Sequence, residues 1–140
     1  MTRVHATCVA IGGRAVLLLG ASGSGKSDLA LRLIDRGAVL VSDDQTDLAT
    51  VAGTVYASAP ATIAGLIEVR GVGIVTLPFV TQVPLALAVR LGEPVMRMPE
   101  TGLTEVFTGV AIPLFRADSY EASATIKVEL ALKQATDEAS

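Results

Sequence analysis

A glycine-rich loop that directly follows a short apolar run constrains the fold of this 140-residue chain more than any other feature. The loop, GASGSGKSD, begins at Gly20 and follows the run Ala15–Leu19. It matches the pattern G-x-x-x-x-G-K-[ST] with Gly20, Gly25, Lys26 and Ser27. In that pattern backbone N–H groups converge on phosphate oxygens, while the lysine neutralises their charge and the hydroxyl binds Mg²⁺. We therefore expect a phosphate-binding loop for a nucleoside triphosphate; a flexible Gly/Ser connector is the alternative.

The residues around the loop predict a strand, a helix and a second strand. Apolar residues recur at helical spacing after the loop, and Asp28 and Arg32 are spaced to pair across one helical turn. We expect a strand over residues 14–19, a helix over 26–36 and a short buried strand over 38–41. This order is typical of a βαβ unit with parallel strands.

The rest of the chain is rich in strand patterns. A first strand is expected over residues 3–11, with Gly12 and Gly13 as the turn of a hairpin. Further strands are expected over residues 46–51, 54–58, 65–69, 74–77 and 85–89. A helix is expected over residues 119–134, followed by a frayed tail over 135–140. Its inward-facing residues would be Tyr120, Ala124, Val128 and Ala131. The expected fold class is α/β with a mixed, strand-rich sheet.

Composition excludes several classes of protein. The chain is 51% hydrophobic with a mean hydropathy of +0.56, which suits one compact domain over residues 1–140. Its net charge of −3 and its lack of Lys/Arg runs argue against nucleic acid as a partner. The apolar runs are too short to span a membrane. The single cysteine, Cys8, can close no internal disulfide and is expected in the core. We expect a cytoplasmic protein without structural zinc.

Two adjacent aspartates, Asp43 and Asp44, follow the second strand of the expected βαβ unit. The carboxyl ends of parallel strands meet at one edge of a sheet, so this pair is expected beside the phosphate loop. Phosphoryl transfer needs a carboxylate that assists the metal and a group that accepts a proton. Adjacent strand residues point to opposite faces, so the two aspartates cannot do the same job, and which one is the base stays open. A turn capped by an Asp side chain is the alternative.

An acid and a base are expected on one face of the strand pattern that begins at residue 65. Glu68 and Arg70 alternate with Ile67 and Val69, immediately before a glycine-containing loop. A surface salt bridge on an edge strand is the alternative to a functional pair. His5 lies within the first expected strand, where a histidine is by itself more often structural than catalytic.

These stretches together resemble the HPr kinase/phosphorylase family, in its catalytic domain only. The resemblance rests on His5 before the hairpin, GASGSGKS from Gly20, VSDD from Val41 and IEVRGVGIV from Ile67. The last stretch is similar to the family's Glu-x-Arg-Gly-x-Gly signature. The resemblance implies a P-loop fold of the HPr kinase/phosphoenolpyruvate carboxykinase type. It also implies MgATP-dependent phosphorylation of a serine on HPr, a small phosphocarrier protein of the sugar or nitrogen phosphotransferase systems.

The resemblance implies roles for individual residues. It assigns the phosphate cradle for ATP to Gly20, Ala21, Ser22, Gly23, Ser24, Gly25, Lys26 and Ser27. It assigns the Mg²⁺ ligands to Ser27 and Glu68. It places in the active site Lys26, the acid/base and metal-assisting pair Asp43 and Asp44, and the neighbours His5 and Arg70.

The chain departs from the family's pattern after Ile74. The segments VTLPFVTQV and PLFRADSYE contain one basic residue, Arg116, where the family carries basic and glycine-containing stretches. A second bound anion needs such donors, so we expect a kinase with little or no phosphorylase activity. The resemblance also allows a homo-oligomer. A small-molecule P-loop kinase and a non-catalytic nucleotide-binding regulatory module are the alternative functions.

Overall fold

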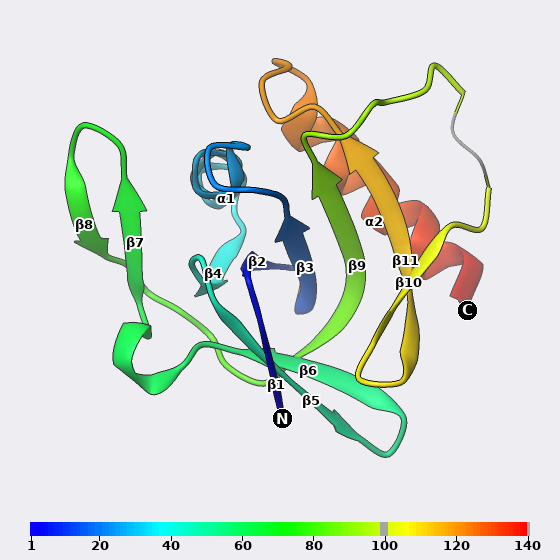
Figure 1. The fold of residues 1–140 in the computed structure, drawn as a ribbon, viewed down its shortest axis with the longest axis horizontal. Helices are drawn as coiled ribbons and strands as arrows, with labels where there is room; N and C mark the ends of the chain where they lie inside the picture. The colour runs from blue at the N-terminus through cyan, green and yellow to red at the C-terminus, as the bar shows by residue number, and fades with distance from the viewer. Residues whose placement is uncertain (99–100, 140) are drawn as a thin grey trace.

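The computed structural model describes residues 1–98 and 101–139, which form a large mixed sheet, a separate hairpin and two α-helices on one side of the sheet (Figure 1). The strands are β1 (Thr2–Val4), β2 (Ala6–Ile11), β3 (Arg14–Leu19), β4 (Val39–Ser42), β5 (Thr46–Val51), β6 (Thr54–Ser58), β7 (Leu66–Val69), β8 (Gly73–Thr76), β9 (Val83–Leu91), β10 (Thr104–Phe107) and β11 (Val110–Ala117). The helices are α1 (Lys26–Asp35), the 3₁₀ helix η1 (Ala61–Ile63) and α2 (Ala124–Ala139). The main sheet has the order β1-β5-β6-β9-β3-β2-β4, with β11 paired to both β9 and β10.

The predicted βαβ unit is present, with one strand inserted into its sheet. β2 pairs antiparallel with β3 on one side and with β4 on the other, so β3 and β4 run parallel to each other. Gly12 and Gly13 close the β2–β3 hairpin with φ angles of 58° and 78°, which glycine adopts freely. β9 pairs parallel with β3 and with β11. The carboxyl ends of β3, β4, β9 and β11 consequently lie at one edge of the sheet (Figure 1).

The prediction of one strand over residues 3–11 is wrong, because this segment forms two strands with different partners. β1 pairs with β5, whereas β2 lies between β3 and β4. The chain changes partners at His5, which belongs to neither strand. Alternating residues do not reveal such a change, since both halves are extended. Because Ala6 pairs with Leu19, His5 lies at the edge of the sheet where the phosphate loop begins.

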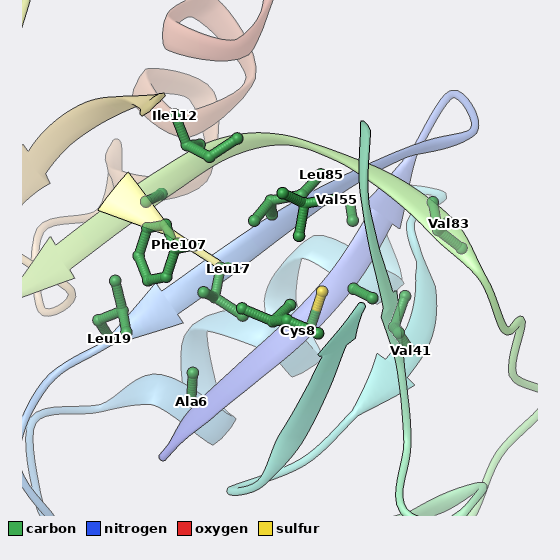
Figure 2. Close-up of a cluster of buried hydrophobic side chains, with 14 of the residues drawn as sticks. Ala6, Cys8, Leu17, Leu19, Val41, Val55, Val83, Leu85, Phe107 and Ile112 are labelled. Atoms are coloured by element: carbon green, nitrogen blue, oxygen red, sulfur yellow. The ribbon is translucent and has the colours of Figure 1, made fainter. Parts of the chain in front are cut away.

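Alternate residues of the central strands fill two hydrophobic clusters, one on each face of the sheet. Leu18 of β3 shares the first cluster with Leu29 of α1 and with residues of α2. Leu17 points to the opposite face, where the curled sheet brings Phe107 of β10 into a second cluster (Figure 2). Cys8 belongs to this second cluster, as predicted, and burial raises the pKa of its thiol. The helices and the sheet curl therefore hold the central strands rigidly from both sides.

The carboxyl-terminal part differs most from the sequence predictions. The hairpin of β10 and β11 is not predicted, because Pro113 interrupts the strand pattern. α2 begins at Ala124 rather than at residue 119, and it continues to Ala139. Residues 135–139, where the sequence predicts a frayed tail, are helical in the structure, and Ser140 lies outside the described residues. Among the helices that the structure describes, none combines the length and apolar character that crossing a membrane requires.

The residues before α2 form a separate turn instead of the first turn of the helix. The Tyr120 N–H donates to Asp118 Oδ1 (2.9 Å), so the Asp118 side chain closes a turn of its own. Ala124 and Val128 are buried as predicted, and Ala131 is partly buried against the same cluster. Tyr120 is 76% exposed, so its predicted inward packing is wrong. The turn directly follows the carboxyl end of β11 and lies beside the phosphate loop (Figure 1).

Candidate phosphate-binding site

The loop between β3 and α1 has the backbone geometry of a phosphate cradle. Gly23 and Gly25 have φ angles of 83° and 90°, a region that residues with a Cβ rarely adopt. Space excludes a side chain as well, because a Cβ on Gly25 would lie 2.4 Å from Ser119 Oγ. A Cβ on Gly20 would lie 2.5 Å from Ser24 Oγ. The glycines of the motif are therefore required by both conformation and packing.

Lys26, the lysine of the motif, lies across the loop and is almost buried. Its Nζ donates to the carbonyl oxygens of Gly20 (2.7 Å) and Ala21 (3.1 Å). The side chain is 7% exposed, so its charge faces the interior of the loop rather than bulk water. A cation held in this position can neutralise phosphate oxygens that enter the loop.

Asp43 lies beside the phosphate loop, as the strand order predicts. Ser27 Oγ donates to Asp43 Oδ1 over 2.6 Å, and Thr7 Oγ1 donates to the same oxygen over 3.1 Å. The other carboxylate oxygen, Oδ2, accepts from the backbone N–H of Glu68 (3.0 Å). Asp43 is 7% exposed, so three donors fix a nearly buried carboxylate. The geometry unites Ser27, Asp43 and the Glu68 backbone, three of the positions predicted from the sequence.

Asp44 has a different environment from Asp43, as predicted for adjacent residues. Its Oδ1 lies 2.7 Å from His5 Nε2, and the two side chains are 65% and 52% exposed. The backbone N–H of Asp44 donates to Thr7 Oγ1 (3.2 Å), and its φ of 65° turns the chain away from the end of β4. Aspartate tolerates this conformation better than most residues. One aspartate is thus locked beside Ser27, and the other lies open to solvent beside a histidine.

Glu68 and Arg70 lie in different secondary-structure elements. Glu68 lies in β7, and Arg70 lies in the turn that follows; both are exposed. The alternative of a surface salt bridge requires an ion pair between these two side chains. Within residues 1–98 and 101–139, the structure has no such pair. The Glu68 backbone N–H donates to Asp43, so this residue lies at the edge of the site, and its side chain is exposed. Arg70 makes no hydrogen bond that ties it to the site within the described part of the chain.

The oxygen ligands near Ser27 fit Mg²⁺ in the way that nucleotide sites hold it. The described residues contain no cluster of three or more His, Cys, Asp and Glu side chains that could cage a metal. Mg²⁺ in phosphoryl-transfer sites needs no such cage, because it takes one or two protein oxygens together with phosphate oxygens and water. The Ser27 hydroxyl and the Asp43 carboxylate provide adjacent oxygens beside the loop.

Several residues at the site are missed by sequence reasoning. Thr7 bridges Asp43 and Asp44, and its spacing of two residues from His5 is the signal that could have placed it. Ser119 and Tyr120 donate to the loop carbonyls from the turn before α2. No motif marks these two residues, because their contacts span 95 and 97 positions of the chain.

Comparisons with known proteins agree with this geometry. The sequence profile of the HPr Serine kinase C-terminal domain family matches residues 1–81. The HPr kinase/phosphorylase of Clostridium tetani (strain Massachusetts / E88) is 44% identical over 77 residues, which are 55% of this chain and 25% of that protein. The HPr kinase/phosphorylase of Clostridium botulinum (strain Eklund 17B / Type B) is 45% identical over 74 residues, 53% of this chain and 24% of that protein. The chain thus spans about a quarter of the length of these curated relatives.

A solved structure extends the similarity to the whole chain. The structure of the Hpr(Ser) kinase/phosphatase from Coxiella burnetii superposes with a TM-score of 0.84 and 27% sequence identity. The superposition covers 99% of this chain and 98% of that chain. The α/β fold with a strand-rich curled sheet and a carboxyl-terminal helix is therefore that of this relative, as the sequence predicts.

Proposed function

Because the chain belongs to the family of HPr serine kinase C-terminal domains, we propose that it transfers the γ-phosphoryl group of ATP to a serine of an HPr-type phosphocarrier protein in the cytoplasm. The observation that carries the proposal is the 2.6 Å hydrogen bond from Ser27 to Asp43 beside the phosphate loop. It joins the hydroxyl of the loop to the carboxylate after the neighbouring parallel strand, which is the pairing that an ATP site requires.

Each side chain of the site has a separate task in this proposal. The loop N–H groups and Lys26 hold the β- and γ-phosphates. Ser27 and Asp43 would hold Mg²⁺, with Glu68 at the edge of the same site. When bound with the nucleotide, Mg²⁺ supplies positive charge that offsets the charge on the transferring group.

We assign the role of proton acceptor to Asp44 and not to Asp43. The three donors on Asp43 occupy its oxygens and hold it beside Ser27. Asp44 is open to solvent, and His5 holds one of its oxygens over 2.7 Å. A base on a folded-protein substrate must be reachable from outside, since the serine arrives on a rigid surface. The exposure of Asp44 meets that condition, and it favours a protein acceptor over an enclosed small molecule.

We infer the direction of the reaction from the basic residues near the carboxyl ends of the strands. Arg116 lies 3.4 Å from Glu93, and Arg90 donates to both carboxylate oxygens of Glu105 over 2.7 and 2.6 Å. Cations that are already paired attract free phosphate weakly. We therefore propose a kinase with little or no phosphorylase activity. Incubating the serine-phosphorylated partner with phosphate and Mg²⁺ tests this; pyrophosphate release as fast as the forward reaction would overturn it.

The decisive experiment uses labelled ATP, Mg²⁺ and a purified HPr-type protein, with the chain itself as the enzyme. The expected product is acid-stable phosphoserine on the HPr-type protein, and Lys26→Ala serves as the inactive control. An HPr variant in which alanine replaces the acceptor serine should remain unlabelled. Nucleotide binding without any transfer would instead favour a regulatory module, and label in small molecules alone would favour a small-molecule kinase.

A further inference from the structure

The turn between β11 and α2 contacts the phosphate loop from the side opposite to Asp43. Ser119 Oγ donates to the carbonyl oxygen of Ser24 (2.6 Å), and the Tyr120 hydroxyl donates to the carbonyl oxygen of Gly23 (2.7 Å). Ser119 is 2% exposed, so its hydrogen bond is shielded from water, whereas Tyr120 lies at the surface. Two consecutive carbonyls of the loop are thus held by residues from the far end of the chain.

The direction of a carbonyl decides the direction of the neighbouring N–H. A peptide unit is planar, and its C=O and N–H point to opposite sides. Holding the Ser24 carbonyl against Ser119 therefore directs the N–H of Gly25 away from the turn. A phosphate cradle needs its N–H groups turned toward the anion, because a carbonyl turned inward would repel it. The orientation of this peptide accordingly decides whether Gly25 can donate to a phosphate.

The loop has few means of its own to keep this orientation. The peptide that carries the Ser24 carbonyl ends at Gly25, whose freedom in φ makes rotation of this peptide inexpensive. Ser24 Oγ is buried and has no hydrogen-bond partner within the described part of the chain, so that hydroxyl does not hold the loop. Lys26 holds the carbonyls of Gly20 and Ala21, at the start of the loop only. Within the loop, the Ser24 N–H donates to the Ala21 carbonyl (3.0 Å) and so supports the Gly23–Ser24 peptide, to which Tyr120 adds a second bond. The next peptide, which joins Ser24 to Gly25, has its carbonyl held by Ser119 of the turn.

The turn is itself tied to the helix that follows the loop. Arg32 of α1 donates to the carbonyl oxygen of Ser119 through Nη2 and lies near that of Glu121 (3.5 Å) through Nη1. Arg32 also pairs with Asp28 one helical turn earlier, over 3.0 Å, as predicted. Hydrogen bonds therefore link the loop to the turn and the turn to α1.

We propose that Ser119 and Tyr120 are positioning residues that hold the Gly23 and Ser24 carbonyls outward and so keep the phosphate loop ready for nucleotide. This inference rests on the proposed function, because it assumes that the loop binds nucleotide phosphates. The two residues touch the loop and not the phosphates, so their loss weakens binding without removing a reacting group.

The test is a calorimetric titration of MgADP into the wild-type chain and into Ser119→Ala and Tyr120→Phe. Each variant removes one hydroxyl, and we expect affinity to fall roughly fivefold, with the larger loss at the buried Ser119. Tyr56→Phe is the matched control for the tyrosine, and Ser123→Ala is the control for the serine. Ser119→Thr keeps a hydroxyl and should recover most of the affinity. In kinase assays the KM for ATP should rise while the KM for the HPr-type protein stays unchanged.

The outcomes separate this proposal from the function on which it rests. A wild-type chain that binds no MgADP would overturn both. A wild-type chain that binds MgADP with the same affinity as Ser119→Ala and Tyr120→Phe would overturn only the positioning role. If Ser119→Ala melts at a much lower temperature than the wild-type chain, its affinity cannot be compared, and the Tyr120→Phe variant provides the test because its ring stays in place. An unchanged affinity of Tyr120→Phe for MgADP would then overturn the proposal.

Discussion

The two flanks of the phosphate loop are built from different parts of the chain. The aspartate flank consists of Thr7, Asp43 and Glu68, all within the residues that the family profile matches. The turn flank consists of Ser119 and Tyr120, which lie beyond residue 81 and outside that match. The solved Coxiella burnetii relative nevertheless superposes over 99% of this chain. The match to the family profile therefore includes only the aspartate flank, whereas the structural similarity extends over both flanks.

The difference between the flanks has a chemical reason. The aspartate flank needs a carboxylate and a hydroxyl at fixed places, so only particular residue types can form it. The turn flank needs any donor that reaches a backbone carbonyl, and different side chains meet that requirement. A site can thus be recognised in sequence on its reacting side while its supporting side is visible only in three dimensions.

The largest effect is expected at the lysine of the loop that lies between the two flanks. Lys26→Ala removes the cation of the loop and should slow transfer by about 10³- to 10⁵-fold, the range for a charge that stabilises the transferring phosphoryl group. It should also weaken ATP binding. Steady-state kinetics and titration measure the two effects, with Lys133→Ala on the exposed face of α2 as a control. Wild-type turnover in Lys26→Ala would refute the phosphate loop.

The next largest effect is expected at Asp44, the solvent-exposed aspartate beside the aspartate flank. Asp44→Asn should lower kcat by about 10²- to 10⁴-fold and leave ATP affinity nearly unchanged, because a proton acceptor acts in the chemical step. Asp43→Asn should instead raise the Mg²⁺ requirement, since Asp43 accepts from Ser27. Titration of ATP and of Mg²⁺ beside the kinetics distinguishes the two. The reverse pattern would exchange the roles of the two aspartates.

A smaller effect is expected from Glu68. Glu68→Gln keeps the shape of the side chain and loses its charge, so the Mg²⁺ concentration for half-maximal rate should rise by roughly tenfold. The backbone N–H that holds Asp43 remains in this variant, so Asp43 stays in place. Rates measured across a Mg²⁺ series provide the comparison. An unchanged Mg²⁺ profile would remove Glu68 from the metal site.

The smallest effect concerns the contact between the two helices. Nη2 of Arg36, the residue that follows the last residue of α1, lies 2.7 Å from Oε1 of Glu129 in α2, and both side chains are partly exposed. Such a pair contributes less than about 1 kcal/mol to the free energy of unfolding. Urea unfolding of Arg36→Ala, Glu129→Ala and the double variant measures the coupling. A coupling well above that value would mean that the turn flank depends on how α1 and α2 pack.

Most of the aspartate flank follows from the sequence. The G-x-x-x-x-G-K-[ST] motif, the helix after it and the apolar strand before Asp43 are local patterns, and parallel strands bring their carboxyl ends together. These facts are enough to place Ser27 and Asp43 side by side. They also predict that Asp44 differs from Asp43, although not that His5 would be its partner.

Other features depend on partners that are remote in the chain. The break at His5 exists because β1 pairs with β5 while β2 pairs with β3 and β4, a choice that alternation of residues does not encode. The sequence predicts Tyr120 inside a helix, yet its hydroxyl donates to the Gly23 carbonyl from a turn. Helical spacing cannot tell a first turn of helix from a turn stabilised by a distant loop.

The sequence by itself determined the phosphate loop, its helix and the aspartate that faces it, because each depends on residue types within a short span. Only the tertiary structure decided what holds the loop carbonyls outward. That contact joins Ser24 to Ser119 across 95 positions. Its partner on the loop is a backbone carbonyl, which every residue possesses, so no residue type on the loop side signals it.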